Sequence, residues 1–166
     1  MAKAAENGSD ELRKQLTALL NGGQAHATFD DAVKDFPEEH RGTVPEGLPY
    51  SAWQLLEHIR VTQHDILLFS APPSGGYQPI AWPDDYWTNS AKPSAAHAWE
   101  TSIAAVHKDR EAFEKLISNP DAYLYKPFRW GEGQNLLREA LLIADHNAYH
   151  IGELILLRRL LGIWHK

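Results

Sequence analysis

Two histidines four residues apart, near the end of the sequence, are its clearest chemical signal. His146 and His150 lie in a segment whose apolar residues recur at helical spacing, so both imidazoles are expected on one helix face. Two imidazoles placed one turn apart can bind the same metal ion, as in helical zinc sites. Nine histidines in 166 residues also form such pairs by chance, so the spacing alone is a weak indication.

The position of this pair on the predicted helix strengthens the indication. On a helical wheel both histidines fall on the same side as Ile143, Leu154 and Leu157, which are expected to face the core. A buried imidazole without a partner costs about 1–3 kcal/mol, so two of them need a metal ion, a carboxylate or each other. The alternative is that they are core histidines with satisfied hydrogen bonds, and the spacing does not decide between the two.

A third ligand must come from another helix, and His58 is the first candidate. It falls on the shoulder of the apolar stripe of its helix, whereas His64 faces solvent. His107 is the second candidate because it lies near the inward direction of its helix, and His97 is expected to be exposed. Three neutral imidazoles suit zinc, nickel, copper or iron(II), and they leave positions open for water or substrate.

Two carboxylates lie on the histidine side of the last predicted helix. Glu153 follows His150 by one turn, and Glu139 precedes His146 by two turns. Either carboxylate can orient a ligand imidazole or bind a water on the metal, and the alternative is a solvated shoulder that pairs with arginine. A di-iron carboxylate centre would need Glu-x-x-His motifs, and the sequence contains none.

Four main helices are predicted to position these side chains. Ser51 and Gln54 form a capping box at the start of the second helix, and Pro72 stops it. The expected helices cover about 10–21, 51–71, 93–118 and 135–161, with a short helix at 29–36. Four amphipathic helices of comparable length predict an all-α, antiparallel four-helix bundle. The chain length suits a single domain over 1–166, with its core at about 10–164.

The connections 71–93 and 119–134 are long and rich in aromatic residues. Long loops in a compact domain are often functional or packed against its body. We expect the aromatic residues to hold the loops over the ends of the bundle, with a pocket rim or a dimer contact as alternatives. These residues are Tyr77, Trp82, Tyr86 and Trp87 in the first connection, and Tyr123, Tyr125, Phe128 and Trp130 in the second.

The composition limits the classes of function. A formal net charge of −6 argues against binding to a nucleic-acid backbone. The absence of cysteine excludes disulfides, Cys-ligated zinc and a cysteine nucleophile, and it fits the expected cytoplasmic location. The first residues lack the apolar core of a signal peptide, and no stretch approaches the ~20 apolar residues of a membrane span. Neither nucleic acid nor membrane is therefore an expected partner.

Two segments of the sequence resemble the DinB/YfiT-like family. These are 53–58, which ends at His58, and 144–154, which contains His146 and His150. The segment 82–87 is also similar to a loop of some members, and the resemblance covers roughly residues 10–164. It implies a four-helix bundle in which these three histidines hold a divalent metal ion, zinc or nickel first and iron or manganese as alternatives.

The resemblance also implies a homodimer and a role for a low-molecular-weight thiol. Characterised relatives include bacillithiol transferases and a mycothiol-dependent maleylpyruvate isomerase. The sequence is therefore interpreted as a metal-dependent enzyme of the thiol S-transferase or hydrolase type. The alternative is a non-catalytic metal- or small-molecule-binding stress-response module. Many members have glutamine where this chain has Glu153, which adds a charge close to the expected metal.

Overall fold

The computed structural model of the chain describes residues 2–164. Its regular secondary structure is entirely helical, with no strand over these residues. The five α-helices are α1 (Ala2–Asn21), α2 (Phe29–Val33), α3 (Ala52–Ser70), α4 (Ala98–Ser118) and α5 (Leu136–Leu160). Two short 3-10 helices, η1 (Glu38–His40) and η2 (Asp84–Tyr86), lie in the connections. Within the described range, no helix is long and apolar enough to cross a membrane.

Local capping explains why α3 begins where the sequence predicts. The Ser51 hydroxyl accepts a hydrogen bond from the Gln54 backbone N–H at 3.2 Å, and the Gln54 side chain accepts one from the Ser51 N–H at 3.1 Å. Thr28 and Asp31 form the same reciprocal cap at the start of α2. The capping box predicted at Ser51 is therefore confirmed, and α2 has one of the same kind.

Three predicted helix ends are wrong by several residues. α1 begins at Ala2 rather than at Asp10, because the alanine-rich segment before Ser9 favours helix and Ser9 does not cap it. α4 begins at Ala98 rather than near position 93, because His97 has the left-handed φ of 63° and cannot continue a helix. α2 stops at Val33 rather than at position 36, and the positive φ of Asp35 follows directly.

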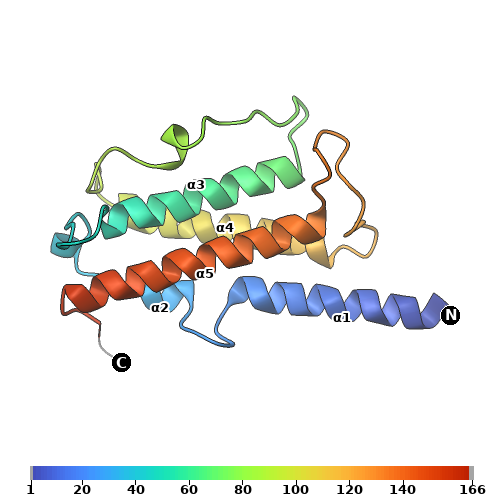
Figure 1. The fold of residues 1–166 in the computed structure, drawn as a ribbon, viewed down its shortest axis with the longest axis horizontal. Coiled ribbons are helices and arrows are strands. Elements are labelled where there is room, and N and C mark those ends of the chain that lie inside the picture. Colours follow the sequence, from blue (N-terminus) through green and yellow to red (C-terminus); the bar gives the residue numbers. More distant parts are fainter. Residues whose placement is uncertain (1, 165–166) are drawn as a thin grey trace.

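The four long helices pack alongside one another, and α1 and α3 each contact both α4 and α5 (Figure 1). α3 and α4 run in the same direction, because their hydrogen-bonded partners rise together in number: residues 57, 63 and 64 of α3 bond to residues 102, 106 and 109 of α4. The expected antiparallel order therefore fails for this pair. The connection 71–97 runs back along α3 and brings the chain to the end where α3 began (Figure 1).

The apolar core consists of two clusters, one toward each end of the bundle. One cluster includes Trp53, Trp99 and Leu154, and the other includes Phe113 and Ile143. Between them, α3, α4 and α5 carry polar residues at 62–64, 107–110 and 145–147. His146 of the candidate site lies in this polar belt, and the belt's buried side chains must find partners inside the bundle.

Candidate metal centre

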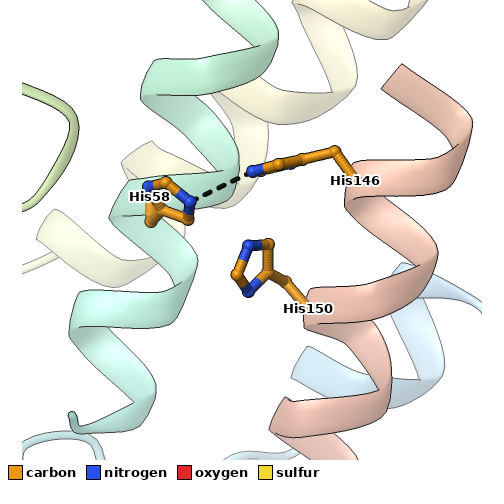
Figure 2. Close-up of side chains that lie close together, drawn as sticks. All are labelled: His58, His146 and His150. Atoms are coloured by element: carbon orange, nitrogen blue, oxygen red, sulfur yellow. Dashed lines mark hydrogen bonds between the residues drawn. The ribbon is translucent and has the colours of Figure 1, made fainter. Parts of the chain in front are cut away.

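The imidazoles of His58, His146 and His150 meet between α3 and α5 (Figure 2). His58 and His150 are buried and His146 is partly exposed, and one ring nitrogen from each lies within 4.8 Å of the others. The Nε2 atoms of His58 and His146 are 3.0 Å apart. The structure thus brings together the three histidines that the sequence analysis selected from nine.

Each of these rings has a hydrogen-bond acceptor at its other nitrogen. His58 Nδ1 lies 3.0 Å from the backbone carbonyl oxygen of Tyr86, and His150 Nδ1 lies 2.7 Å from the carboxylate of Glu153. His146 Nδ1 has a longer contact of 3.4 Å with the Asn147 side-chain oxygen. A neutral imidazole that donates from Nδ1 keeps a lone pair on Nε2. The three lone pairs therefore point into the space that the rings share.

This arrangement fits a transition-metal ion. The Nε2 atoms of His58 and His146 are 3.0 Å apart. Two nitrogen lone pairs that face each other at this distance repel unless a proton or a cation lies between them. A proton would satisfy one pair of nitrogens, whereas one metal ion would satisfy all three. Nitrogens that share an ion at about 2.0–2.1 Å lie roughly 3 Å apart, close to the observed separation. Three imidazoles, each oriented by an acceptor at Nδ1, are a common donor set for zinc and its neighbours.

Burial keeps the rings in the form that binds metals. Burial, with a smaller contribution from charge repulsion by the nearby His150 and His58, lowers the pKa of His146 to about 4. Burial likewise lowers the pKa of His58, which outweighs the opposing effect of its bond to Tyr86. At neutral pH both imidazoles are therefore uncharged and available as ligands.

Glu153 is the carboxylate that supports the site. It accepts the bond from His150, and the hydroxyls of Tyr50 and Tyr149 also bond to it. Burial and the Glu153 carboxylate raise the pKa of Tyr50, and the charge of Glu153 raises that of Tyr149, so both phenols remain donors. The carboxylate is thus held in place from three sides.

Glu139, the other carboxylate considered from the sequence, lies elsewhere. It is buried, its Oε1 accepts a hydrogen bond from Arg138 at 2.8 Å, and it contacts none of the three histidines. A helical wheel places it on the correct side of α5 but ignores its distance along the axis. Two turns separate it from His146, which is too far for contact.

An aromatic wall covers the α3 side of the site. Trp87 stacks on the His58 ring, with centroids 3.9 Å apart and planes at 9°, and Tyr50 stacks on Trp87 at 5.3 Å. The connection that carries Trp87 is fixed to α3 because Tyr77 and Tyr86 donate to Asp65 at 2.8 and 2.6 Å. The first aromatic connection therefore packs along α3, beside the candidate site.

Two side-chain amides, one of them buried, hold the segment that contains His146. Asn147 donates to the side-chain oxygen of Gln63 at 2.9 Å, and Gln63 donates to the backbone carbonyl of Val106 at 2.7 Å. Sequence reasoning missed Gln63, Asn147 and Tyr50. The two amides could have been found in the sequence, because each is an uncharged polar residue at a helix position where the apolar spacing predicts a core residue.

The remaining histidines considered from the sequence have other partners. His107 contacts the Asp30 carboxylate at 2.6 Å, and His64 contacts that of Asp109 at 2.8 Å. His97 is exposed at the start of α4, as expected. None of the three approaches the cluster, so His58 rather than His107 joins the pair on α5.

The fold and the cluster agree with the comparison to protein families. The profile described as the DinB superfamily matches residues 10–154, and the chain belongs to this superfamily. The searches of curated proteins and of solved structures found no significant match.

Proposed function

We propose that the protein is a metal-dependent enzyme in which His58, His146 and His150 hold one divalent transition-metal ion. Zinc or nickel is the first choice, with iron or manganese as alternatives. The observation that carries the proposal is the convergence of three imidazoles whose Nδ1 atoms each face an acceptor. Membership of the DinB superfamily supports it.

The reaction class that we propose is thiol S-transfer, with hydrolysis as the related possibility. When bound, the metal would supply a Lewis acid that lowers the pKa of a thiol or a water. Glu153 orients His150, Trp87 covers the ring of His58, and the exposed Tyr149 hydroxyl stands beside His150. Because the chain has no cysteine, the thiol would be a separate small molecule.

The scaffold that we propose is a single four-helix-bundle domain built from α1, α3, α4 and α5, acting as a homodimer. The second copy is inferred from the resemblance to the family, and the α5 surface discussed below supports it. No basic surface needed for nucleic-acid binding is expected from a net charge of −6.

A non-catalytic metal-binding module is the second candidate, and the position of the cavities favours it. One cavity of about 900 Å³ lies beside Arg41 and Lys92, and another of about 740 Å³ lies beside Lys34 and Arg158. Neither is lined by any of the three histidines. A metal site that adjoins neither cavity would serve a structural or sensory purpose.

Elemental analysis of untagged protein purified without chelator tests the metal site. We expect about one transition-metal ion per chain, and its loss in both His58→Ala and His150→Ala. Thiol transfer to a model electrophile then separates the two candidates. Metal-dependent acceleration supports the enzyme, whereas stoichiometric metal with no acceleration supports the binding module. Failure to bind zinc, nickel or manganese contradicts both.

A further inference from the structure

The outward face of α5 carries apolar residues that nothing in the described chain covers. Leu141, Tyr149, Leu156 and Leu160 are between 46% and 65% exposed, although each belongs to a helix whose opposite face is core. They follow one another at intervals of eight, seven and four residues, so they lie on one side of α5. Surface apolar residues gathered on one face commonly mark an interaction site.

Two opposite charges and a glycine lie on the same face at heptad spacing. Asp145, Gly152 and Arg159 are seven residues apart, so they line up along α5 with the glycine midway. Both charged side chains are exposed, and neither has a hydrogen bond or an ion pair in the part of the chain described. A Cβ added at Gly152 would meet no atom within 4 Å. The middle of this face is therefore bare backbone.

These positions are self-complementary under a twofold axis. When two antiparallel helices are related by an axis that passes beside residue 152, each residue before it faces the one equally far after it. Asp145 then faces Arg159 of the second copy, and the same pair forms again across the axis. The absence of a side chain at Gly152 lets the two helix backbones approach at the crossing point.

The apolar residues obey the same symmetry. Leu156 is four residues after Gly152, and Ala148 is four residues before it, so a large side chain meets a small one. Ala148 lines a shallow groove of about 600 Å³ between α1 and α5, together with Leu19, Leu141 and Ala144. A large apolar side chain against a mainly apolar groove that includes two alanines is a complementary contact.

We propose that a second copy of the chain binds this face of α5, antiparallel about Gly152, with reciprocal Asp145–Arg159 ion pairs. The inference specifies the homodimer that forms part of the proposed function, and it rests on that part only. Its consequence for the metal site is direct. Tyr149, which is 65% exposed and lies edge-on to His150, belongs to the same face and becomes covered. The partner therefore closes the side of the site on which Tyr149 stands.

Charge reversal tests the pairing, with the mass in solution measured by sedimentation as a function of concentration. We expect the unmodified protein to be dimeric, and Asp145→Arg and Arg159→Asp each to raise the dimer dissociation constant at least tenfold. An equimolar mixture of the two variants restores complementary charges at both contacts, so we expect it to dimerise. Glu111→Arg, an exposed change on α4, is the matched control and should leave the dimer intact.

A second variant guards against misfolding. Gly152→Leu places a good helix former where no atom obstructs it, so the helix should be retained or stabilised while the crossing is blocked. Loss of the dimer with unchanged helical circular dichroism supports the proposal. A dimer that resists both charge reversals, or a mixture that does not reassociate, overturns this interface alone. A monomer at every concentration overturns the homodimer as well, and metal content, measured on the same samples, decides the metal site separately.

Discussion

Two polar clusters lie between the helices of the bundle, and their groups are satisfied in opposite ways. Between α3 and α4, Glu57 accepts two bonds from Arg60 and one from Ser102, and His64 pairs with Asp109. Every charged group in that cluster therefore has an opposite or neutral partner. Between α3 and α5, three histidines direct their Nε2 atoms at one another with no carboxylate among those atoms.

The difference shows what sets the candidate metal centre apart from the other histidines of the bundle. His64 also meets a carboxylate at Nδ1, that of Asp109 at 2.8 Å, but in the described part of the chain it belongs to no group of three or more ligand side chains. In the triad the carboxylate of Glu153 likewise lies at Nδ1 of His150, but His150 also lies with two further imidazoles, those of His58 and His146. The convergence of three imidazoles, and not the acceptor behind one ring, therefore distinguishes the candidate ligands from a histidine in an ion pair.

Removing one histidine from each cluster should produce the largest difference in zinc affinity between the two clusters. We expect His146→Ala to weaken zinc binding more than a hundredfold, because only two protein ligands remain. His64→Ala removes an imidazole that faces Asp109 and should leave zinc affinity unchanged. Competition with a chromophoric chelator measures both constants. Equal losses in the two variants would show that the clusters are not distinct.

Glu153 allows a finer distinction between the carboxylates of α5. Glu153→Ala should lower metal affinity about 10–100-fold, because His150 loses the acceptor that orients it. Glu153→Gln should recover much of this loss, since an amide oxygen still accepts from Nδ1. Glu139→Gln is the control, as Glu139 contacts Arg138 and none of the histidines. An effect of Glu139→Gln as large as that of Glu153→Ala would contradict the assignment.

The metal-free protein should lose stability in acid because of His146. Its pKa is about 4 in the folded chain, against the ordinary histidine value of 6.5, so only the unfolded chain takes up a proton between these values. The free energy of unfolding should therefore decrease as the pH falls from 6.5 to 4 and then stop responding to this group. Allowing for its partial exposure, the change is on the order of 1–2 kcal/mol.

Urea denaturation of the chelator-treated protein at pH 7 and pH 4.5 measures this change. His146→Gln removes the titrating ring and should flatten that part of the pH dependence. His107→Gln, which alters a histidine bound to Asp30, serves as the comparison. If His146→Gln retains the full pH dependence, another group is responsible for it.

The smallest expected effect concerns two tyrosines that share one carboxylate. Tyr77 and Tyr86 both donate to Asp65, so Tyr77→Phe and Tyr86→Phe should each cost about 1 kcal/mol of unfolding free energy. Only Tyr86 also offers its carbonyl to His58, so only Tyr86→Phe should weaken metal binding, by a few-fold. Thermal denaturation and zinc titration of the pair measure both quantities. Equal metal affinities would mean that the hydroxyl does not help to place this carbonyl.

The helices and their caps depend on local sequence and could be predicted. The relative direction of neighbouring helices depends on tertiary packing and could not. The capping box at Ser51 and the apolar spacing of α3 and α5 depend on residues within a few positions of one another. The same spacing is compatible with either direction of a helix, so the parallel pair α3 and α4 left no signal. The left-handed turn at His97 likewise has no pattern that marks it.

The candidate site follows the same division. The helical wheel selected three histidines because inward direction is a property of one helix at a time. It could not choose between Glu139 and Glu153, since a wheel discards distance along the axis. It could not find Tyr50 or the carbonyl of Tyr86, because both reach the site from irregular segments whose path depends on tertiary packing.

That path has a consequence for how the site tolerates sequence change. The acceptors for His150 and His146 are side chains, so a single substitution can remove either of them. The acceptor for His58 is a backbone carbonyl, which every amino acid supplies at position 86. Its loss requires a displaced main chain, for example through an insertion or deletion between 71 and 97. Insertions and deletions in this connection should therefore damage the site more than substitutions there do.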